Sequence, residues 1–235
     1  MSFSPENPQK SPAREPARNE QGSWQSFRFL DGSKSYQEIW DFQKAQLTEI
    51  AEGRAPEALI FCEHERLLTK GKRSSAENLL QKSLPVYEIE RGGDFTWHGP
   101  GQLVIYPLFY LQGEFFPKGL HAFLRFWEEV LIQVLKDFQL EAGRFGPTGV
   151  WIKNSRSEIK KIASMGIAVR KWITYHGIAL NVSNSLEDFK MIRPCGFESE
   201  VMTSLENEGV SKSLLELSHL IEEKARSLLQ LESRG

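Results

Sequence analysis

The fold class is decided by residues 162–182, which read IASMGIAVR, then KW, then ITYHGIALNV. Each outer run is short and rich in strand-forming residues. Only Lys171 and Trp172 separate the two runs. So short a connection joins antiparallel neighbours, because parallel strands need a crossover of about a dozen residues or more. The stretch therefore predicts adjacent antiparallel strands at 162–170 and 173–182 and disfavours a purely parallel, doubly wound sheet.

Outside this pair, the sequence predicts three helices and further short strands. Helical spacing begins at Ser35, where Ser35 and Glu38 fit a capping box, and it stops at Gly53. Apolar periodicity predicts a second helix over 120–138 and a third from about Ser213, with Leu217, Leu220, Ile221, Leu228 and Leu229 on one face. Shorter β-rich runs lie at 58–62, 86–90, 103–108 and 150–153. We therefore expect an α/β protein of the mixed α+β kind.

Composition and charge exclude several classes of protein. Of 235 residues, 40% are hydrophobic and 11% aromatic, which is too many for a disordered chain. The 29 basic and 31 acidic groups leave a net charge of −2, so the positive excess of a nucleic-acid binder is missing. The longest uncharged stretch, 95–113, contains prolines and glycines and is a poor membrane span. With no secretory signal, we expect a cytoplasmic protein that engages neither nucleic acid nor membrane.

The chain divides into a short tail and one long unit. Residues 1–22 contain four prolines and almost nothing to bury, so we expect a flexible N-terminal tail. From Trp24 onward, no internal repeat, low-complexity tract or linker splits the sequence. We therefore expect residues 23–235 to form one domain.

The two cysteines, Cys62 and Cys195, have different settings. They allow neither a disulfide framework nor a zinc cluster, so we expect no metal. Cys62 lies in an apolar strand, which indicates a buried core residue. Cys195 lies between Pro194 and Gly196, and this setting presents a thiol at a turn. A single cysteine is nevertheless more often an inert hydrophobic residue, so its setting alone leaves both interpretations open.

A catalytic role for Cys195 requires a cation or base beside it, since only the thiolate is a strong nucleophile. The candidates are Lys161, His176 and His98. Lys161 opens a strand that continues into small residues, which allows its ammonium group to reach a cleft. His176 precedes Gly177 in an apolar strand, where a glycine marks a bulge or a ligand lying against the backbone. The histidine alone is equally well explained as a hydrogen-bonded core residue.

Residues 91–102, RGGDFTWHGPGQ, form the most unusual segment. Four glycines and a proline between two predicted strands leave backbone N–H groups unshielded, so the segment is able to approach a ligand closely. A tight β-hairpin, in which the glycines merely permit positive φ, explains them equally well. The segment matches neither the phosphate-loop pattern nor the dinucleotide-binding pattern.

Four separated blocks together closely resemble one family, the lipoyl(octanoyl) transferases. The blocks are RGGDFTWHGPGQLV at 91–104, GVWI at 149–152, KKIASMGI at 160–167 with HGIALNV at 176–182, and PCG at 194–196. Their order and spacing agree with the family over about Trp24 to Glu232. The resemblance implies that residues 23–235 are the catalytic domain. It also implies the biotin/lipoate protein ligase fold, a mixed sheet with packed helices.

The resemblance implies a reaction in protein lipoylation and its partners. The donor is octanoyl-acyl carrier protein, whose phosphopantetheine thioester carries the octanoyl group, so neither a cofactor nor ATP is expected. The acceptor is a lysine ε-amino group on a lipoyl domain. Such domains belong to the E2 subunits of 2-oxoacid dehydrogenases and to the glycine cleavage H protein.

The matching motifs also imply roles for individual residues. Cys195 is the implied nucleophile that holds the acyl thioester. Lys161 is implied to lower the pKa of that thiol and to transfer protons, although His176 is an alternative proton acceptor. The implied substrate-binding residues are Arg91, Gly92, Gly93, Asp94, Phe95, Thr96, Trp97, His98, Ser164, Met165, Gly166, Gly177, Ile178 and Ala179. Thr148 departs from the family pattern, because it stands between a proline and a glycine, Pro147 and Gly149, that usually adjoin. We expect it in a peripheral loop.

Three rival functions stay open. An ATP-dependent lipoate or biotin protein ligase of the same fold has no need of Cys195. A non-catalytic relative binds lipoyl domains with an idle cysteine, and the presence of both Cys195 and Lys161 argues against it. A Cys-His hydrolase must admit water, whereas acyl transfer to an amine must exclude it.

Overall fold

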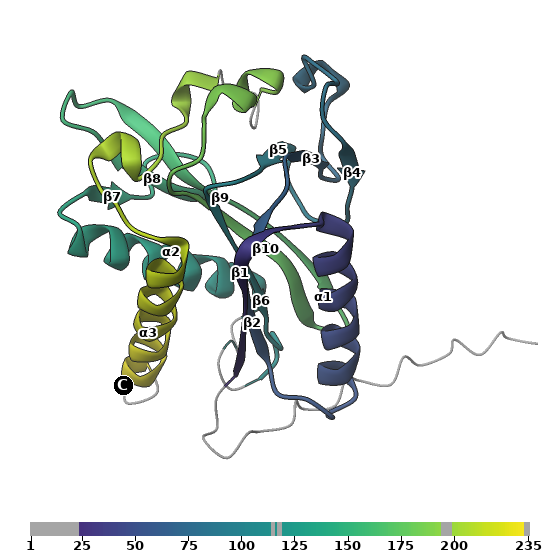
Figure 1. Cartoon of the computed structure of the whole chain (residues 1–235). Helices are drawn as coiled ribbons and strands as arrows, with labels where there is room; N and C mark the ends of the chain where they lie inside the picture. The colour runs from purple at the N-terminus through teal and green to yellow at the C-terminus, as the bar shows by residue number, and fades with distance from the viewer. Residues whose placement is uncertain (1–23, 114–115, 117–118, 194–198, 233–235) are drawn as a thin grey trace, which may run out of the picture.

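The computed structural model describes residues 24–113, 116, 119–193 and 199–232. The predicted tail at 1–22 lies outside these residues, and so does Cys195. Within the described part, the chain forms two β-sheets, three α-helices and several short 3₁₀ turns (Figure 1). The predicted mixture of α and β structure is confirmed.

A seven-stranded sheet forms the centre of the described chain. Its strands are, in spatial order, β1 (Gln25–Lys34), β2 (Ala58–His64), β6 (Gln102–Leu108), β10 (Ile173–Asn181), β9 (Ile159–Arg170), β8 (Gly149–Lys153) and β7 (Glu141–Gly143). Only β1 and β2 pair in parallel, and every other neighbouring pair is antiparallel. A second sheet contains β4 (Val86–Glu88), β3 (Leu67–Lys70) and β5 (Phe95–His98), in that order. The prediction of a mixed sheet is therefore correct.

The β9–β10 hairpin confirms the antiparallel pair that the sequence predicts. Its register runs from Arg170↔Ile173 to Ala163↔Leu180. The connecting residues Lys171 and Trp172 have φ of +52° and +63°. Positive φ at both central residues is the geometry of a type I′ turn, whose twist matches that of the flanking strands. The hairpin places residues 164–166 directly opposite residues 177–179, so two of the sequence blocks become neighbours.

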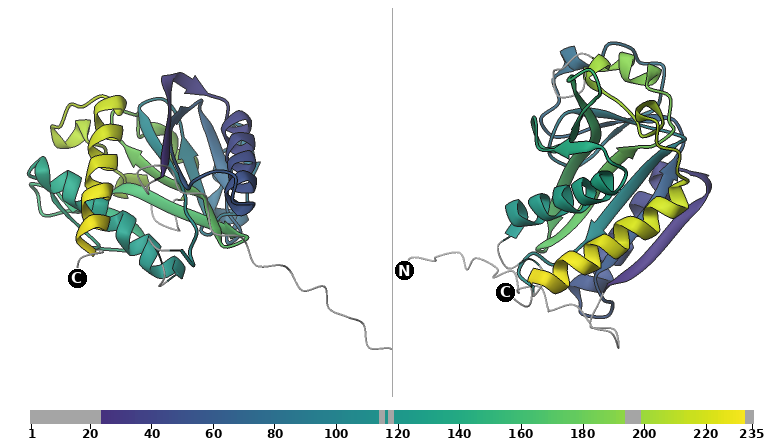
Figure 2. Two further views of the ribbon diagram at one scale, coloured as in Figure 1. Left: turned by 90° about the horizontal axis from the view of Figure 1, so that it is seen from below. Right: turned by 90° about the vertical axis from the view of Figure 1, so that its left-hand side faces the viewer.

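Helices cover both faces of the central sheet. α1 (Tyr36–Ala51) packs on one face, whereas α2 (Gly119–Asp137) and α3 (Leu214–Glu232) pack on the other (Figure 2). No helix in the described part of the chain is long and apolar enough to cross a membrane.

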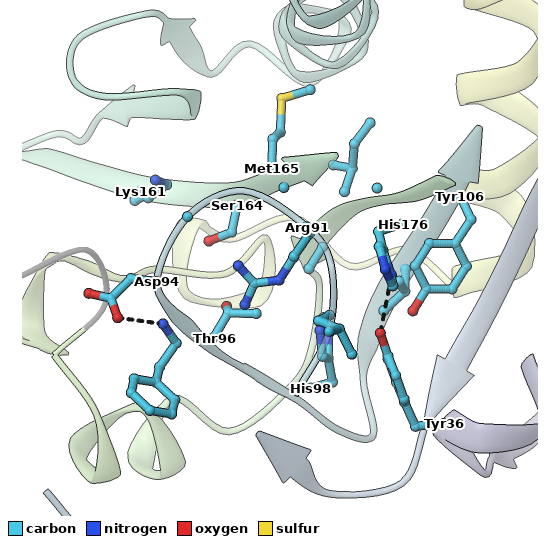
Figure 3. Close-up of a pocket in the computed structure, with 18 residues that line it drawn as sticks. Tyr36, Arg91, Asp94, Thr96, His98, Tyr106, Lys161, Ser164, Met165 and His176 are labelled. Carbon is cyan, nitrogen blue, oxygen red and sulfur yellow. Dashed lines mark hydrogen bonds between the residues drawn. The ribbon is translucent and has the colours of Figure 1, made fainter. Parts of the chain in front are cut away.

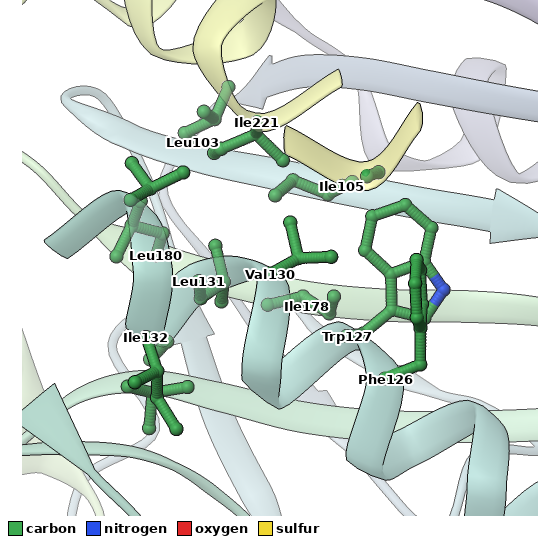
Figure 4. Packing of buried hydrophobic residues seen from close by; sticks show 14 of the residues in the cluster. Leu103, Ile105, Phe126, Trp127, Val130, Leu131, Ile132, Ile178, Leu180 and Ile221 are labelled. Carbon is green, nitrogen blue, oxygen red and sulfur yellow. The ribbon is translucent and has the colours of Figure 1, made fainter. Parts of the chain in front are cut away.

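The strands at the centre of the sheet are buried from both sides. In β6, Leu103 and Ile105 contact the α2–α3 layer, whereas Val104 and Tyr106 contact the α1 layer. Figure 4 shows the α2–α3 layer, in which Trp127, Val130 and Leu131 of α2 lie beside these strands. Burial on both faces explains why residues 103–108 are apolar throughout, because neither face of the strand meets water.

Two details of the helix predictions are wrong, although all three helices form where expected. Ser35 stands at the N-cap of α1, but its side chain makes no capping hydrogen bond. In α3, Leu220 is 37% exposed and does not join the buried face. The buried stripe follows i, i+4 spacing and consists of Leu217, Ile221, Ala225 and Leu229.

Candidate active site

A pocket opens between the small sheet and the β9–β10 hairpin. The space it encloses, with the open solvent at its mouth included, is about 600 Å³. The lining residues come from α1, both sheets and the segment before β5 (Figure 3). They are Tyr36, Ile89, Arg91, Gly93, Asp94, Phe95, Thr96, His98, Val104, Tyr106, Lys161, Ser164, Met165, Gly166, His176, Gly177, Ile178 and Ala179.

Most of the residues that the sequence marks for substrate binding meet in this pocket, and Lys161 lines it with them. The structure does not bring Gly92 and Trp97 to the lining. Because side chains alternate along β5, Trp97 points away from the face that carries Thr96 and packs on Phe189, with ring centroids 5.4 Å apart. The Gly92 N–H donates to the Ile167 carbonyl at 3.1 Å and so ties the segment to β9.

The glycine-rich segment 91–102 is not a tight hairpin. Its strand β5 pairs with β3, from Lys70↔Phe95 to Leu67↔His98, and not with the following strand β6. The hairpin interpretation is therefore wrong. The segment instead forms one wall of the pocket, and a strand distant in sequence holds it in place.

Lys161 enters the pocket because β9 contains a bulge. Opposite β8, the register shifts between Val150↔Ala163 and Trp151↔Lys161, which leaves Ile162 unmatched. A bulge breaks the alternation of side chains along a strand. As a result, Ile162 and Ala163 both join the core, while Lys161 and Ser164 both line the pocket.

The Lys161 side chain is only 4% exposed, and two groups beside it are described. Its Nζ donates to the Thr148 carbonyl at 3.0 Å and lies 5.1 Å from the centre of the Trp151 ring. Thr148 lies, as expected, in an exposed loop, which joins β7 to β8, but its carbonyl contacts the pocket lysine directly. Sequence reasoning had no signal for this contact, which depends on a backbone atom.

Buried hydroxyls and imidazoles occupy another part of the pocket. His176 Nδ1 lies 3.3 Å from the Tyr36 hydroxyl, and its Nε2 lies 3.2 Å from the Glu90 carboxylate. Next to them, His98 Nδ1 lies 2.8 Å from Gln102 Oε1, and Tyr106 reaches His64 Nε2 at 2.8 Å. No cluster of His, Cys, Asp and Glu among the described residues is placed to hold a metal ion.

Burial keeps the three histidines of this network neutral. It lowers the pKa of His98 to about 3 and the pKa values of His64 and His176 to about 4. The hydrogen bond and charge of Glu90 oppose this effect at His176, but they do not overcome it. These imidazoles therefore act near neutral pH as hydrogen-bonding groups and not as cations.

Arg91 is buried in the wall of the pocket. Its Nη2 donates to the carbonyl and hydroxyl of Thr69 at 3.0 and 2.9 Å, and its Nη1 donates to the Gly92 carbonyl at 3.0 Å. A Cβ at Gly166 would lie 2.7 Å from Arg91 Cδ, so the arginine fills the space that this glycine leaves. The glycine in β9 thus makes room for a side chain of the protein itself.

At Gly177, which lines the pocket, the strand pairing between β10 and β6 breaks. His176 has φ of +56°, and Pro107 of the neighbouring strand lacks an N–H group. The β6–β10 ladder therefore ends at Ile178↔Ile105. A Cβ at Gly177 would lie 1.9 Å from the Ile105 carbonyl oxygen, so only glycine permits this close approach.

Of the two cysteines, Cys62 lies within the described residues. Cys62 has no exposed surface and packs under α1, so the predicted core position is confirmed. Burial raises the pKa of its thiol well above the ordinary value. Cys195 lies outside the described residues.

Contacts on both sides of Cys195 attach the chain to the pocket. Before it, the Arg193 N–H donates to the Asn78 carbonyl at 2.9 Å, and the Asn78 side chain bonds the carboxylate of Asp94. After it, Met202 forms a β-bridge with Lys161, and the Thr203 N–H donates to the Lys161 carbonyl at 3.0 Å. The segment after Cys195 therefore contacts a lining residue directly, and the segment before it is linked to one through Asn78.

Sequence reasoning missed several lining residues, namely Tyr36, Ile89, Val104 and Tyr106. Val104 and Tyr106 are two residues apart in a predicted strand, so their side chains lie on the same face. If one of them lines the pocket, the other is expected to line it too. Tyr36 carried a weaker signal, because helical periodicity marks it only as a core position.

Comparison with known proteins places this fold and site in context. The family model of the lipoyl protein ligase A/B catalytic domain matches residues 35–224. The octanoyltransferase of Syntrophotalea carbinolica is 44% identical over 178 residues, which cover 74% of this chain and 80% of that protein. The octanoyltransferase of Cytophaga hutchinsonii is 42% identical over 199 residues, which cover 75% of this chain and 81% of that protein.

A solved structure shows the same fold at low identity. It contains a bipartite lipoate protein ligase and its E2 lipoyl domain from Thermoplasma acidophilum. The two chains superpose with a TM-score of 0.62 and 17% identity, over 92% of this chain and 93% of the other. The predicted lipoate protein ligase fold is therefore confirmed.

Proposed function

This chain belongs to the octanoyltransferases of the lipoyl protein ligase A/B catalytic domain family, and we propose that Cys195 carries the octanoyl group between donor and acceptor. It is an acyltransferase of protein lipoylation. In the proposed reaction, the donor is the phosphopantetheine thioester of an acyl carrier protein. The acceptor is a lysine ε-amino group of a lipoyl domain.

The observation that carries this proposal is the buried Lys161 ammonium in the pocket, with the segment after Cys195 bonded to Lys161 and the segment before it linked through Asn78 to Asp94 of the same pocket. A thiol near a buried cation ionises more readily, because the cation stabilises the thiolate. Lys161 is therefore the proposed partner of the Cys195 thiolate.

The first half of the proposed reaction transfers the acyl group to the protein. The Cys195 thiolate attacks the thioester carbonyl, a new C–S bond forms, and the bond to the pantetheine sulfur breaks. The Lys161 ammonium donates a proton to the leaving thiolate and becomes a neutral amine. One thioester replaces another, so this step needs no further source of free energy.

The second half transfers the acyl group to the acceptor. The neutral amine of the acceptor lysine attacks the Cys195 thioester, an amide C–N bond forms, and the C–S bond breaks. Lys161 takes up the proton that the amine loses, which restores both the ammonium and the thiolate. An amide is more stable than a thioester, so no ATP is consumed and no cofactor is required.

The pocket offers an apolar surface for the octanoyl chain. Ile89, Val104 and Met165 line it, together with Ile178 and Ala179 of the hairpin. Each buried CH₂ group contributes about 0.8 kcal/mol, so an alkyl chain supplies binding free energy that a short acyl group lacks. This surface supports octanoyl as the group transferred.

The proposed acceptors are the lipoyl domains of 2-oxoacid dehydrogenase E2 subunits and the glycine cleavage H protein. The ligase from Thermoplasma acidophilum, which shares the fold, was solved together with its E2 lipoyl domain. A surface that accepts such a domain is part of the proposal for this chain, and we place the reaction in the cytoplasm.

An acylation experiment tests the proposal. Incubation with octanoyl-acyl carrier protein, without ATP, is expected to add one octanoyl mass to the intact protein. The variant Cys195→Ala should lose the adduct. The matched control Cys62→Ala should keep it, because Cys62 is buried in the core. Absence of an adduct on the wild-type chain, or its persistence in Cys195→Ala, rejects the thioester mechanism, and a requirement for ATP favours the ligase instead.

A further inference from the structure

α2 carries one buried carboxylate on a face that is otherwise apolar. The Glu128 side chain is 1% exposed, and its neighbours along the buried face of the helix, such as Trp127 and Leu131, are buried as well. Its Oε2 accepts hydrogen bonds from Arg125 Nη1 at 2.6 Å and from Arg144 Nε at 2.9 Å. A buried carboxylate is costly unless it is paired, and these two arginines pair one of its oxygens.

The other oxygen, Oε1, contacts the loop that precedes β8, beside the pocket. Glu128 Oε1 accepts a hydrogen bond from the Gly149 N–H at 3.1 Å. That N–H belongs to the same peptide group as the Thr148 carbonyl, which accepts the hydrogen bond from Lys161 Nζ at 3.0 Å. A single peptide group therefore has a carboxylate at its N–H end and an ammonium at its carbonyl end.

This arrangement strengthens the contact to Lys161. A carboxylate that accepts from a peptide N–H increases the negative charge on the carbonyl oxygen of that peptide, because hydrogen bonds in a chain polarise one another. Bonds to charged groups are also about twice as strong as those between neutral groups. The Thr148 carbonyl is thus a better acceptor for an ammonium group than an isolated carbonyl would be.

The backbone at Gly149 permits the contact. Its φ is +127°, and a Cβ there would lie 2.4 Å from the Ala163 carbonyl oxygen and 2.9 Å from Lys161 Cε. Only glycine allows the peptide to lie flat against β9 and the lysine stem. The same peptide would be displaced by any side chain at this position.

We propose that Glu128 is a positioning residue for Lys161, which it holds through the Thr148–Gly149 peptide group. The role rests on the proposed function, in which Lys161 exchanges protons during acyl transfer. By favouring the ammonium form, Glu128 helps Lys161 to take up the proton that the acceptor amine loses. It also fixes the direction in which the lysine points.

Several other charged groups contribute to the field at Lys161. Arg91 and Asp94 line the same pocket. Arg125 and Arg144 lie behind Glu128, on the side away from the peptide. Replacement of Glu128 by Gln removes the negative charge and leaves the positive charges of both arginines in place. The field that remains disfavours a cation at Lys161.

The test compares Glu128→Gln with Glu129→Gln. Glu129 is the adjacent residue and also bonds Arg144, at 2.9 Å, but no described contact joins it to Gly149. In Glu128→Gln, the midpoint of the Lys161 Nζ titration, followed by ¹⁵N NMR and assigned with Lys161→Arg, should fall by about one pH unit. The pH profile of octanoyl transfer should shift with it, and the rate at neutral pH should fall about tenfold. Glu129→Gln should change neither.

A second variant keeps the proposal testable if Glu128→Gln does not fold. Arg125→Gln removes a half-exposed cation that bonds Glu128 and leaves the Gly149 contact intact. It should move the Lys161 titration upward, opposite in sign to Glu128→Gln. An unchanged midpoint in Glu128→Gln, an equal shift in Glu129→Gln, or a downward shift in Arg125→Gln overturns the proposal. These NMR outcomes do not depend on acyl transfer, so a failed acylation experiment rejects the proposed function separately.

Discussion

Lys161 lies on one side of the pocket, and His176, Tyr36 and Tyr106 lie on the other (Figure 3). Titratable groups are buried on both sides. On the histidine side, hydroxyls, an amide and, at His176, the Glu90 carboxylate contact the rings, and burial nevertheless removes their charge. On the lysine side, a carbonyl backed by a carboxylate contacts the ammonium group. A nearby carboxylate therefore does not by itself keep a buried imidazole charged, whereas a lysine begins from a much higher ordinary pKa of about 10.4.

This contrast assigns the chemistry to the Lys161 side and a structural role to the histidines. Replacing Lys161 by Ala should therefore have the largest effect on activity. We expect octanoyl transfer to fall by about 10²- to 10⁴-fold, as is usual when a general acid–base group is lost. Alkylation of Cys195 by iodoacetamide should also require a higher pH. Lys160→Ala, next to it on β9, is the control, and an equal loss in both variants would contradict the assignment.

Acid should destabilise the protein through its neutral histidines. In the unfolded chain, a histidine takes up a proton below about pH 6.5, whereas the folded protein resists protonation down to about pH 3–4 at His64, His98 and His176. The unfolded state therefore binds more protons, and stability falls as the pH drops through this window. Three such groups give a slope of at most about 4 kcal/mol per pH unit.

Denaturant unfolding at several pH values measures this slope. His98→Gln should reduce it by about a third, since one of the three groups is lost. His219→Gln, at an exposed position on α3, should leave it unchanged. A slope that is the same in wild type and His98→Gln would show that His98 is not held neutral in the folded state.

Glycine substitutions separate backbone packing from pocket lining. Gly177→Ala places a Cβ 1.9 Å from the Ile105 carbonyl oxygen, so we expect a loss of about 1–3 kcal/mol in the free energy of unfolding. In Gly92→Ala, the nearest atom would lie at 3.8 Å, an ordinary contact. Thermal unfolding of both variants provides the measurement. Equal losses would mean that the strands do not approach as closely at Gly177 as described.

The smallest effect is expected for His176→Gln. A neutral ring that serves as a hydrogen-bonding group is replaceable by an amide, so the free energy of unfolding should fall by only about 1 kcal/mol. The pH profile of transfer between about pH 5.5 and 7 should keep its shape, since His176 does not titrate there. Loss of an acidic limb from the profile would instead identify His176 as the main proton acceptor.

The sequence predicts the β9–β10 hairpin well because its signals are local. Two strand-forming runs and a two-residue connection leave little choice of topology. By contrast, β5 and its partner β3 have four residues each, and their pairing joins segments about thirty residues apart, so no local periodicity reveals them. β1 and the three-residue β7 were missed as well.

The site shows the same limit. The residues of the sequence blocks could be predicted to form one site because a family pattern marks them together. Glu128 carries no such mark, since its importance arises only where α2 meets the loop before β8. Likewise, the bulge at Ile162 that turns Lys161 into the pocket depends on the register with β8, which side-chain spacing does not encode.

The central claim is that one thiol carries the acyl group and that Lys161 returns its proton. A single-turnover chase tests this claim most directly. Octanoylated protein, freed of the acyl carrier protein and of ATP, is mixed with a lipoyl domain, and both masses are followed. We predict that the octanoyl mass leaves the enzyme and appears on the lipoyl-domain lysine one for one. Hydrolysis to free octanoate, or a stable adduct that never reaches the domain, would contradict the account.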